Sequence, residues 1–285
     1  MEIKMKIAAD DNAHSKMLTI LFIFLLSGSL PIPVLSDTGL DGIINGSHRS
    51  AKHIARNSYR HPVETLNFFN VTNNMNVVEI WPGGGGWYTE ILAPFLKDSG
   101  TLYGAHFASD SKVKFFTDSL DKFKQKTALH PEIYNKIILT ELDAPRKVTL
   151  APPGSADRVL TFRNVHNWLR QDENGYDVFK AMFDALKPGG ILGVVEHRAP
   201  ASFSLEQMQT TGYTTEAFTI ALAERAGFKL VAKSEINANP MDTKDYPKGV
   251  WTLPPTLKLG DKNKEKYLAI GESDRMTLKF VKPLK

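Results

Sequence analysis

The sequence contains no cysteine. Disulfide bonds, thiolate zinc sites, a cysteine nucleophile and a lipidated mature N-terminus are therefore excluded. Charge of one sign is also scarce, because the formal net charge is only +4 and the lysines are interspersed with aspartates and glutamates. No basic stripe with interleaved aromatic residues is present, so we expect no nucleic-acid partner.

Two catalytic signatures are missing as well. The sequence has no G-x-S-x-G motif, which disfavours a serine hydrolase. It also has no H-E-x-x-H motif and no close histidine pair. A metal centre built from His106, His166 and His197 is conceivable, since all three follow expected strands, but the spacing does not favour it. We therefore predict no metal site.

The first 36 residues are expected to be a signal peptide. The apolar run 17–26 follows several lysines and is about ten residues long, whereas a membrane-spanning helix needs roughly twenty. Glycine and proline in 28–33 break any longer helix, and 34–36 resembles a signal peptidase site. We expect a chain beginning near Asp37 that is periplasmic or secreted, with no stable membrane span. An uncleaved N-terminal membrane anchor is the alternative.

The remaining residues, 37–285, alternate short apolar runs with amphipathic stretches. Strands are expected at 76–81, 101–105, 137–142, 158–162, 191–195, 228–236 and 276–281. Helices are expected to begin at His61-Pro62 and to cover 87–96, 113–123, 176–186 and 215–226. This alternation predicts a single α/β domain with a doubly wound, mainly parallel seven-stranded sheet and helices on both faces.

One connection is too long for a simple turn. Residues 237–271 separate the last two expected strands and contain four prolines. A connection of this length in a compact domain is usually a lid, a binding loop or a disordered segment. We expect a lid-like insertion in which Trp251 and the prolines close over a ligand.

The strongest chemical signal is the glycine-rich segment 78–89, V-E-I-W-P-G-G-G-G-W-Y-T. Consecutive glycines after a strand let the backbone turn sharply and let a ligand approach where any Cβ would collide. The pattern does not fit G-x-G-x-x-G, because the sixth position from Gly83 is Tyr88 and from Gly84 it is Thr89. A nicotinamide or flavin cofactor is therefore disfavoured. A turn that binds nothing remains an alternative.

This segment resembles the first motif of the class I S-adenosylmethionine-dependent methyltransferases, which is an acid, an apolar residue and a glycine-rich turn. The chain is also similar to a narrower group of exported, predicted methyltransferases. That similarity rests on five segments in order: E-I-W-P-G-G at 79–84, G-W-Y-T-E-I-L-A-P at 86–94, F-R-N-V-H-N-W at 162–168, E-H-R-A at 196–199 and G-E-S-D-R-M at 271–276. It implies a Rossmann-like methyltransferase fold, S-adenosylmethionine as cofactor and a small-molecule methyl acceptor.

The resemblance also implies roles for individual residues. Its cofactor-binding positions correspond here to Glu79, Gly83, Gly84, Gly85, Gly86, His106 and Asp143, with Asp143 at the adenine. Two positions depart from the superfamily pattern. Trp81 replaces a glycine, and His106 stands where an acid usually grips the ribose. A neutral imidazole offers one hydrogen bond there, whereas a carboxylate offers a charge-assisted pair.

His166 is the candidate catalytic residue. It follows the fourth expected strand at the carboxyl edge, where open α/β sheets bind ligands. An imidazole, with an ordinary pKa near 6.5, can remove a proton near neutral pH. A histidine that is only hydrogen-bonded in a loop is the alternative. Glu196, His197 and Arg198 are expected near the acceptor, and the 271–275 segment is expected to hold an internal arginine–carboxylate pair.

The predicted function is methyl transfer from S-adenosylmethionine to an unidentified acceptor by in-line displacement, with general-base help where the acceptor must lose a proton. The alternative is an exported, non-catalytic protein that binds another small ligand on a methyltransferase scaffold. His106 in place of an acid favours the alternative, and Glu79 with the glycine turn favours the enzyme.

Overall fold

The computed structural model describes residues 39–169 and 174–284. Asp37–Lys285 forms one compact unit. The expected signal peptide and its cleavage site lie outside the described residues. Within the two described ranges, no helix combines the length and the apolar character needed to cross a membrane.

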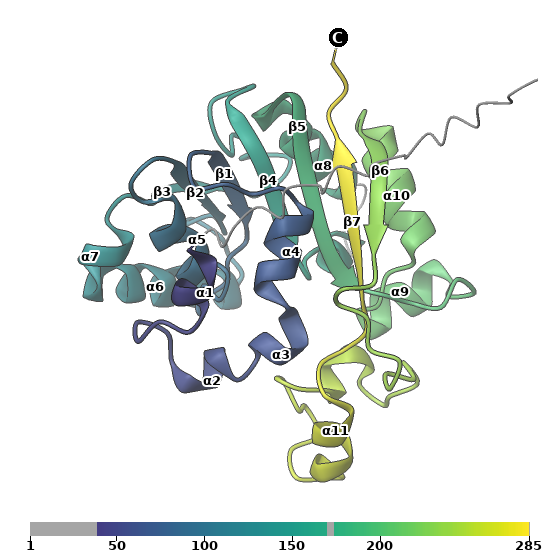
Figure 1. The fold of residues 1–285 in the computed structure, drawn as a ribbon. Coiled ribbons are helices and arrows are strands. Elements are labelled where there is room, and N and C mark those ends of the chain that lie inside the picture. Colours follow the sequence, from purple (N-terminus) through teal and green to yellow (C-terminus); the bar gives the residue numbers. More distant parts are fainter. Residues whose placement is uncertain (1–38, 170–173, 285) are drawn as a thin grey trace, which may run out of the picture. The chain divides into compact units, whose positions relative to one another are not determined.

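The centre of the unit is a seven-stranded sheet with strand order β3-β2-β1-β4-β5-β7-β6 (Figure 1). The strands are β1 (Asn76–Ile80), β2 (Thr101–His106), β3 (Ile138–Glu141), β4 (Ala156–Phe162), β5 (Leu186–His197), β6 (Lys229–Ser234) and β7 (Arg275–Val281). Only β7 runs antiparallel to its neighbours β5 and β6, and the other pairings are parallel. The predicted doubly wound, mainly parallel seven-stranded sheet is confirmed.

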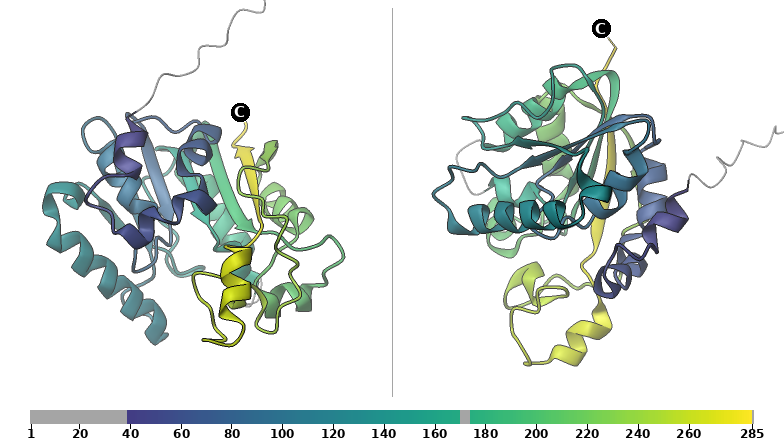
Figure 2. Two further views of the ribbon diagram at one scale, coloured as in Figure 1. Left: turned by 60° about the horizontal axis from the view of Figure 1, so that its bottom comes forward. Right: turned by 90° about the vertical axis from the view of Figure 1, so that its left-hand side faces the viewer.

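Helices cover both faces of this sheet (Figure 2). They are α1 (Leu40–Ile44), α2 (Ala51–Ile54), α3 (Asn57–Arg60), α4 (Pro62–Phe68), α5 (Thr89–Leu96), α6 (Lys114–Leu129), α7 (Pro131–Tyr134), α8 (Asn174–Ala185), α9 (Leu205–Thr211), α10 (Glu216–Arg225) and α11 (Lys264–Ile270), with the 3-10 turns η1 (Val165–Leu169) and η2 (Gly249–Thr252). Successive side chains of a strand point to opposite faces. Val77 therefore packs with α1, α4 and α5, whereas Val78 and Ile80 pack with α8 and its neighbours.

Helix α5 begins at Thr89, two residues later than predicted, because Gly86 adopts a left-handed conformation with φ 52° and the following aromatic residues belong to the turn. Pro94 lies inside α5 and has no N–H to donate to the Glu90 carbonyl. The His48 imidazole donates to that carbonyl instead, at 2.9 Å. The helix ends two residues after the proline, as the sequence indicated.

Strand β5 begins at Leu186, five residues earlier than predicted. The lysine-proline-glycine-glycine stretch 187–190 lies between the expected helix 176–186 and the expected strand 191–195. In the structure the Gly189 N–H donates to the Lys282 carbonyl at 2.8 Å, and the Lys282 N–H donates to the Gly190 carbonyl at 2.9 Å. These backbone hydrogen bonds extend the pairing of β5 with the residues that follow β7. Because the partner residues are distant in sequence, the proline and the glycines alone do not predict this pairing.

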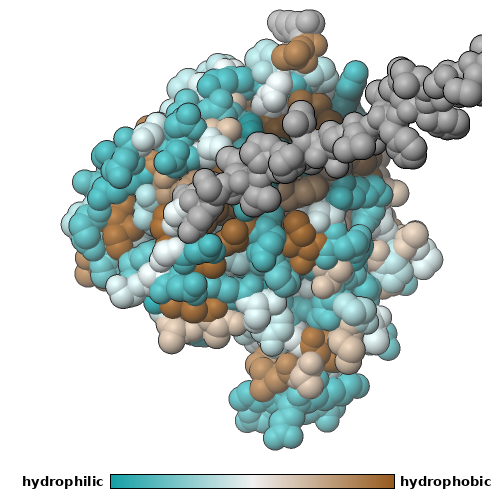
Figure 3. All heavy atoms as spheres, in the orientation of Figure 1, coloured by the Kyte–Doolittle hydropathy of each residue, from teal (hydrophilic) through white to brown (hydrophobic). Residues whose placement is uncertain are grey.

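Segment 237–271 leaves the sheet below the carboxyl ends of the strands and returns as β7 (Figure 1). It contains η2 and α11 and has its own small core of Tyr246, Leu253 and Tyr267. The space-filling view shows hydrophilic residues at the tip of this segment and scattered hydrophobic residues above it (Figure 3). The segment is thus folded, and one side of it reaches the cavity described next.

Candidate functional site

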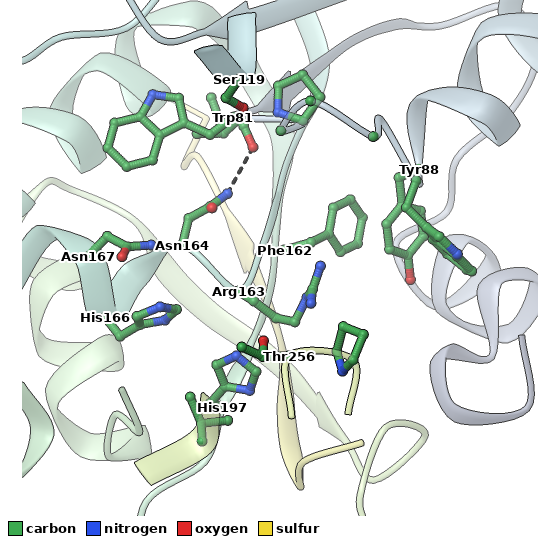
Figure 4. Close-up of a pocket in the computed structure, with 18 of the residues that line it drawn as sticks. Trp81, Tyr88, Ser119, Phe162, Arg163, Asn164, His166, Asn167, His197 and Thr256 are labelled. Carbon is green, nitrogen blue, oxygen red and sulfur yellow. Dashed lines mark hydrogen bonds between the residues drawn. The ribbon is translucent and has the colours of Figure 1, made fainter. Parts of the chain in front are cut away.

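A cavity of about 570 Å³ opens at the carboxyl edge of the sheet. Its walls come from the turn after β1, the loop after β4, the end of β5, helix α6 and segment 250–256 (Figure 4). The strands β1 and β4 are neighbours in the sheet, and their connections leave in opposite directions. This is the topological switch point at which open α/β sheets bind small molecules.

The glycines of the turn have different structural roles. Gly83, Gly84 and Gly85 line the cavity, whereas Gly86 does not. Gly83 has φ 70° and open space where a Cβ would lie. A Cβ on Gly84 would come within 3.1 Å of helix α6, and one on Gly86 within 3.1 Å of the Thr89 hydroxyl. The missing side chain of Gly83 therefore leaves the cavity open, while Gly84 and Gly86 permit close packing.

Glu79 lines the cavity beneath this turn and is buried. Its Oε2 accepts a hydrogen bond from the Thr89 hydroxyl at 2.6 Å. Burial raises the pKa of Glu79 to about 7, although the Thr89 hydrogen bond and the charge of Lys126 act in the opposite direction. The carboxyl group orders the turn through Thr89. A cationic ligand group beside it would lower its pKa again and favour the carboxylate.

His106 ends β2 but does not line the cavity. Its Nδ1 accepts the backbone N–H of Phe107 at 2.8 Å, and its ring packs against Phe107 and Phe123. Burial lowers the pKa of His106 to about 4, so the imidazole is neutral. The residue at the expected ribose position is thus turned into the core and packs beside the glycine turn.

Asp143 also lies outside the cavity. It pairs with Arg146, which in turn pairs with Asp110 at 3.2 Å, and all three side chains are substantially exposed. The expected adenine contact is therefore not part of the cavity wall in this structure. The wall on this side is formed instead by Trp81 and Phe107.

Trp81 stands where the superfamily pattern has glycine, and its φ is 44°. That left-handed conformation is unfavourable for a residue with a Cβ, which explains why glycine suits the position. The indole N–H of Trp81 donates to the Leu142 carbonyl at 3.1 Å, and its ring packs against Phe107 and Trp168. These contacts hold the strained residue in place.

His166 lies in η1, directly after the loop that leaves β4, and lines the cavity beside His197 (Figure 4). Its Nδ1 donates to Glu196 Oε1 at 3.0 Å. Because the carboxylate fixes the proton on Nδ1, Nε2 keeps its lone pair and can accept a proton. Glu196 also accepts the backbone N–H of His197 at 2.7 Å. A buried carboxylate thus orients the candidate base.

The structure does not bring His106 to His166 and His197, but it adds Glu196 to that pair. Donor atoms of His166, Glu196 and His197 all lie within 4.8 Å of one another, a spacing that a metal ion could use. However, both Glu196 oxygens already accept hydrogen bonds. Burial lowers the pKa of His197 well below its ordinary value, and the charges of nearby arginines lower it further. That positive potential opposes a cation.

Two arginines of this site were not expected from the sequence. Arg60 and Arg163 line the cavity, and neither was singled out. Arg163 could have been found, because it directly follows β4 next to the asparagine and histidine that were named. Arg60 comes from α3, in a stretch that showed no helical signal. The arginine–carboxylate pair expected in 271–275 is confirmed by Arg275 and Glu272, whose charged groups are 3.3 Å apart.

Comparison with known proteins shows similarity in fold alone. No protein-family model matches the chain, and no curated protein matches it in sequence. The structure is similar to a SAM-dependent methyltransferase from Aquifex aeolicus, with TM-score 0.50, 13% identity and coverage of 64% of this chain and 87% of that one. It is similar to phosphoethanolamine N-methyltransferase 2 from Haemonchus contortus, solved in complex with S-adenosyl-L-methionine, with TM-score 0.53, 18% identity and coverage of 87% and 58%.

A third similar structure is the cyclase SpnF, with TM-score 0.53, 14% identity and coverage of 87% of this chain and 94% of that one. Together with the strand order and the antiparallel β7, these structures define the fold class. The chain has the Rossmann-like fold of the class I S-adenosylmethionine-dependent methyltransferases. A cyclase on the same fold shows that the fold by itself does not fix the reaction.

Proposed function

We propose that this protein transfers a methyl group from S-adenosylmethionine to a small-molecule acceptor. The observation that carries the proposal is the cavity at the switch point, with the open Gly83 turn and Glu79 on one side and His166 on the other. Similarity to a fold neighbour solved with S-adenosyl-L-methionine supports the same cofactor. The cavity volume is within the range of small-molecule sites.

The residues present fit this cofactor at the turn. Open space at Gly83 allows a ligand to approach the backbone, and Glu79 faces the same space with a carboxyl group suited to an ammonium. The stacked rings of Tyr88 and Phe162, 3.5 Å apart, lie beside it and offer aromatic surface to a cationic ligand. When bound, the cofactor supplies a methyl group on a good leaving group.

The protein's own contribution is then positioning and proton removal. Holding two reactants in line can contribute roughly 7–11 kcal/mol to a barrier reduction. His166 Nε2, with its proton fixed on Nδ1 by Glu196, is placed to accept a proton from the acceptor. Two prolines of segment 237–271, Pro254 and Pro255, form a wall of the cavity together with Val250 and Trp251. This wall would exclude water as a lid.

A second candidate function is binding of a different small ligand without methyl transfer. The observation that favours it is His106, which is buried and neutral and leaves the ribose position without an acid. We also propose that the chain is exported, on the basis of the apolar run 17–26 and the helix breakers that follow it. An exported protein would meet a cytoplasmic cofactor only if that cofactor were supplied to it.

Calorimetric titration of the protein with S-adenosylhomocysteine distinguishes the two candidate functions. A matched pair of glycine variants then tests whether the ligand binds at the glycine turn. Gly83 and Gly154 have similar φ values of 70° and 67°, and both have open space around an added Cβ, but only Gly83 lines the cavity. Both alanine variants carry the same backbone strain of about 1–2 kcal/mol. We expect Gly83→Ala to weaken binding at least about tenfold and Gly154→Ala to leave it unchanged.

If wild type does not bind S-adenosylhomocysteine, the methyltransferase proposal is wrong and the second candidate stands. If wild type binds it and both variants bind equally well, the ligand does not lie against the glycine turn.

A further inference from the structure

The Arg163 guanidinium has no hydrogen-bond or ion-pair partner among the described residues, yet it points into the cavity (Figure 4). Its side chain lies between Phe162 and His197, and its φ of 62° is in the left-handed region. Guanidinium groups in partly enclosed sites ordinarily bind carboxylates or phosphates through paired hydrogen bonds. A strained arginine without a partner in a ligand cavity is therefore a candidate ligand-binding group.

A second, independent observation points the same way. Arg60 is 1% exposed and lines the same cavity. Its Nε donates to Glu272 at 3.1 Å, but neither of its Nη atoms has a hydrogen-bond partner among the described residues. Unsatisfied buried donors are costly, particularly on a charged group. An anion bound in the cavity would satisfy them.

The charge balance of this region favours an anion over a cation. Arg56, Arg60 and Arg275 all contact Glu272, so one carboxylate is shared by three guanidinium groups. Arg163 adds a fourth positive charge near the same carboxylate. Glu196, another buried acid whose charge acts on Arg163, already accepts hydrogen bonds from His166 and from backbone N–H groups. The cavity end near Arg163 therefore carries an excess of positive charge in a partly desolvated setting.

We propose that this end of the cavity binds an anionic group, a carboxylate or a phosphate, on the methyl acceptor. The inference rests on the proposed function and specifies its substrate class. Arg163 directly follows β4, and His166 lies in η1, which begins two residues later; the rings of His166 and His197 are 5.3 Å apart. An acceptor held by Arg163 and Arg60 would thus present its nucleophile near His166. The glycine turn and Glu79 remain free for the cofactor.

The test compares charged and neutral probes of similar shape. The aromatic cavity wall suits a phenyl group, so we use phenylacetate, phenyl phosphate and the neutral phenylacetamide, titrated calorimetrically into the full chain. We expect both acids to bind at least about tenfold more tightly than the amide, since millimolar binding is within calorimetric range. Arg163→Gln should remove about tenfold of the acid affinity, leave the amide unchanged and change S-adenosylhomocysteine affinity by no more than about twofold.

Two further variants control the result. Arg163→Lys keeps the charge and should restore part of the acid preference, because lysine binds anions as a point charge. Arg225→Gln removes the same charge from the exposed face of α10, outside the cavity, and should bind every probe like wild type. Thermal unfolding by circular dichroism confirms that each variant is folded.

Equal binding of acids and amide, or no binding of any acid, overturns the proposal. If Arg163→Gln weakens S-adenosylhomocysteine as much as the acids, the guanidinium serves the cofactor's own carboxylate and the acceptor assignment is wrong. If neither the wild-type protein nor any variant binds S-adenosylhomocysteine while the preference for acids persists, the anion site is supported and the proposed methyltransferase function is wrong.

Discussion

Two residues other than glycine have left-handed backbone conformations in the cavity wall. Trp81 follows β1 and Arg163 follows β4, with φ values of 44° and 62°. The Trp81 N–H donates to the Ala105 carbonyl at 2.8 Å, and the Arg163 N–H donates to the Val195 carbonyl at 2.7 Å. Each bond reaches the next strand of the sheet and holds a conformation that costs about 1–2 kcal/mol. The two strand ends therefore turn in the same way to open the space between them.

His166 is the residue whose chemistry most directly tests the mechanism. Asparagine in its place keeps hydrogen-bonding capacity but cannot accept a proton. We expect His166→Asn to lower the rate of methyl transfer by roughly a hundredfold, the usual size of a general-base effect. S-adenosylhomocysteine affinity should be nearly unchanged. The measurement follows tritium-labelled methyl transfer into a small-molecule extract, across pH 6 to 8.

His130→Asn is the matched control, because His130 is 54% exposed and pairs with Glu132 at the surface, outside the cavity. Full activity of His166→Asn across this pH range would show that His166 is not the base. Loss of folding would show that the Glu196–His166 hydrogen bond is structural.

At the scale of elements, Glu272 joins the N-terminal helices to the start of β7. Arg56 and Arg60, at the two ends of α3, contact Glu272 from one side, and Arg275 at the start of β7 contacts it from the other. Burial raises the pKa of Glu272, but the charges of the surrounding arginines outweigh it and bring the pKa to about 2. The carboxylate therefore remains ionised and joins α3 to β7 through its ion pairs in the cavity wall.

Removing this carboxylate leaves several buried guanidinium groups without a counter-charge. We expect Glu272→Gln to lower the free energy of unfolding by about 3–5 kcal/mol at pH 7, measured by urea unfolding. Because the folded pKa of about 2 is below the ordinary 4.5, the stabilisation is present above pH 4.5 and is lost as pH falls toward 2. The variant should lack this part of the pH dependence.

Glu132→Gln gives the comparison, since Glu132 is 64% exposed and should change stability by less than about 0.5 kcal/mol. Equal stability of Glu272→Gln and wild type would mean that the arginines find other partners or solvent, and the joint between α3 and β7 would not depend on this carboxylate.

At the scale of the whole molecule, the sequence predicts a signal peptide of 36 residues before the folded unit. We expect protein isolated from its host to begin near Asp37, because the apolar run 17–26 is followed by helix breakers and small residues. Intact-mass spectrometry of the cell-envelope fraction measures the N-terminus. A chain that retains residues 17–35 would instead support the membrane anchor.

The sequence by itself determined the fold. All seven strands were predicted near their observed positions, and the alternation of strands with helices predicted a parallel, doubly wound sheet. The positions of the glycine turn and of His166 at the carboxyl edge were also predicted from the sequence, because both follow a strand, and both line the cavity. These features depend on local pattern and on connection order, which the chain carries directly.

Tertiary structure decided what the cavity contains. His106 was expected at the ligand but is buried behind the turn, while Arg60 arrives from α3 and Glu272 from the far end of the chain. No local sequence pattern predicts the contact between Arg60 and Glu272, because the two residues are more than two hundred positions apart. Whether a side chain at a strand end faces the cavity or the core depends on packing against other elements. For that physical reason, the charge of the site emerges only in the folded chain.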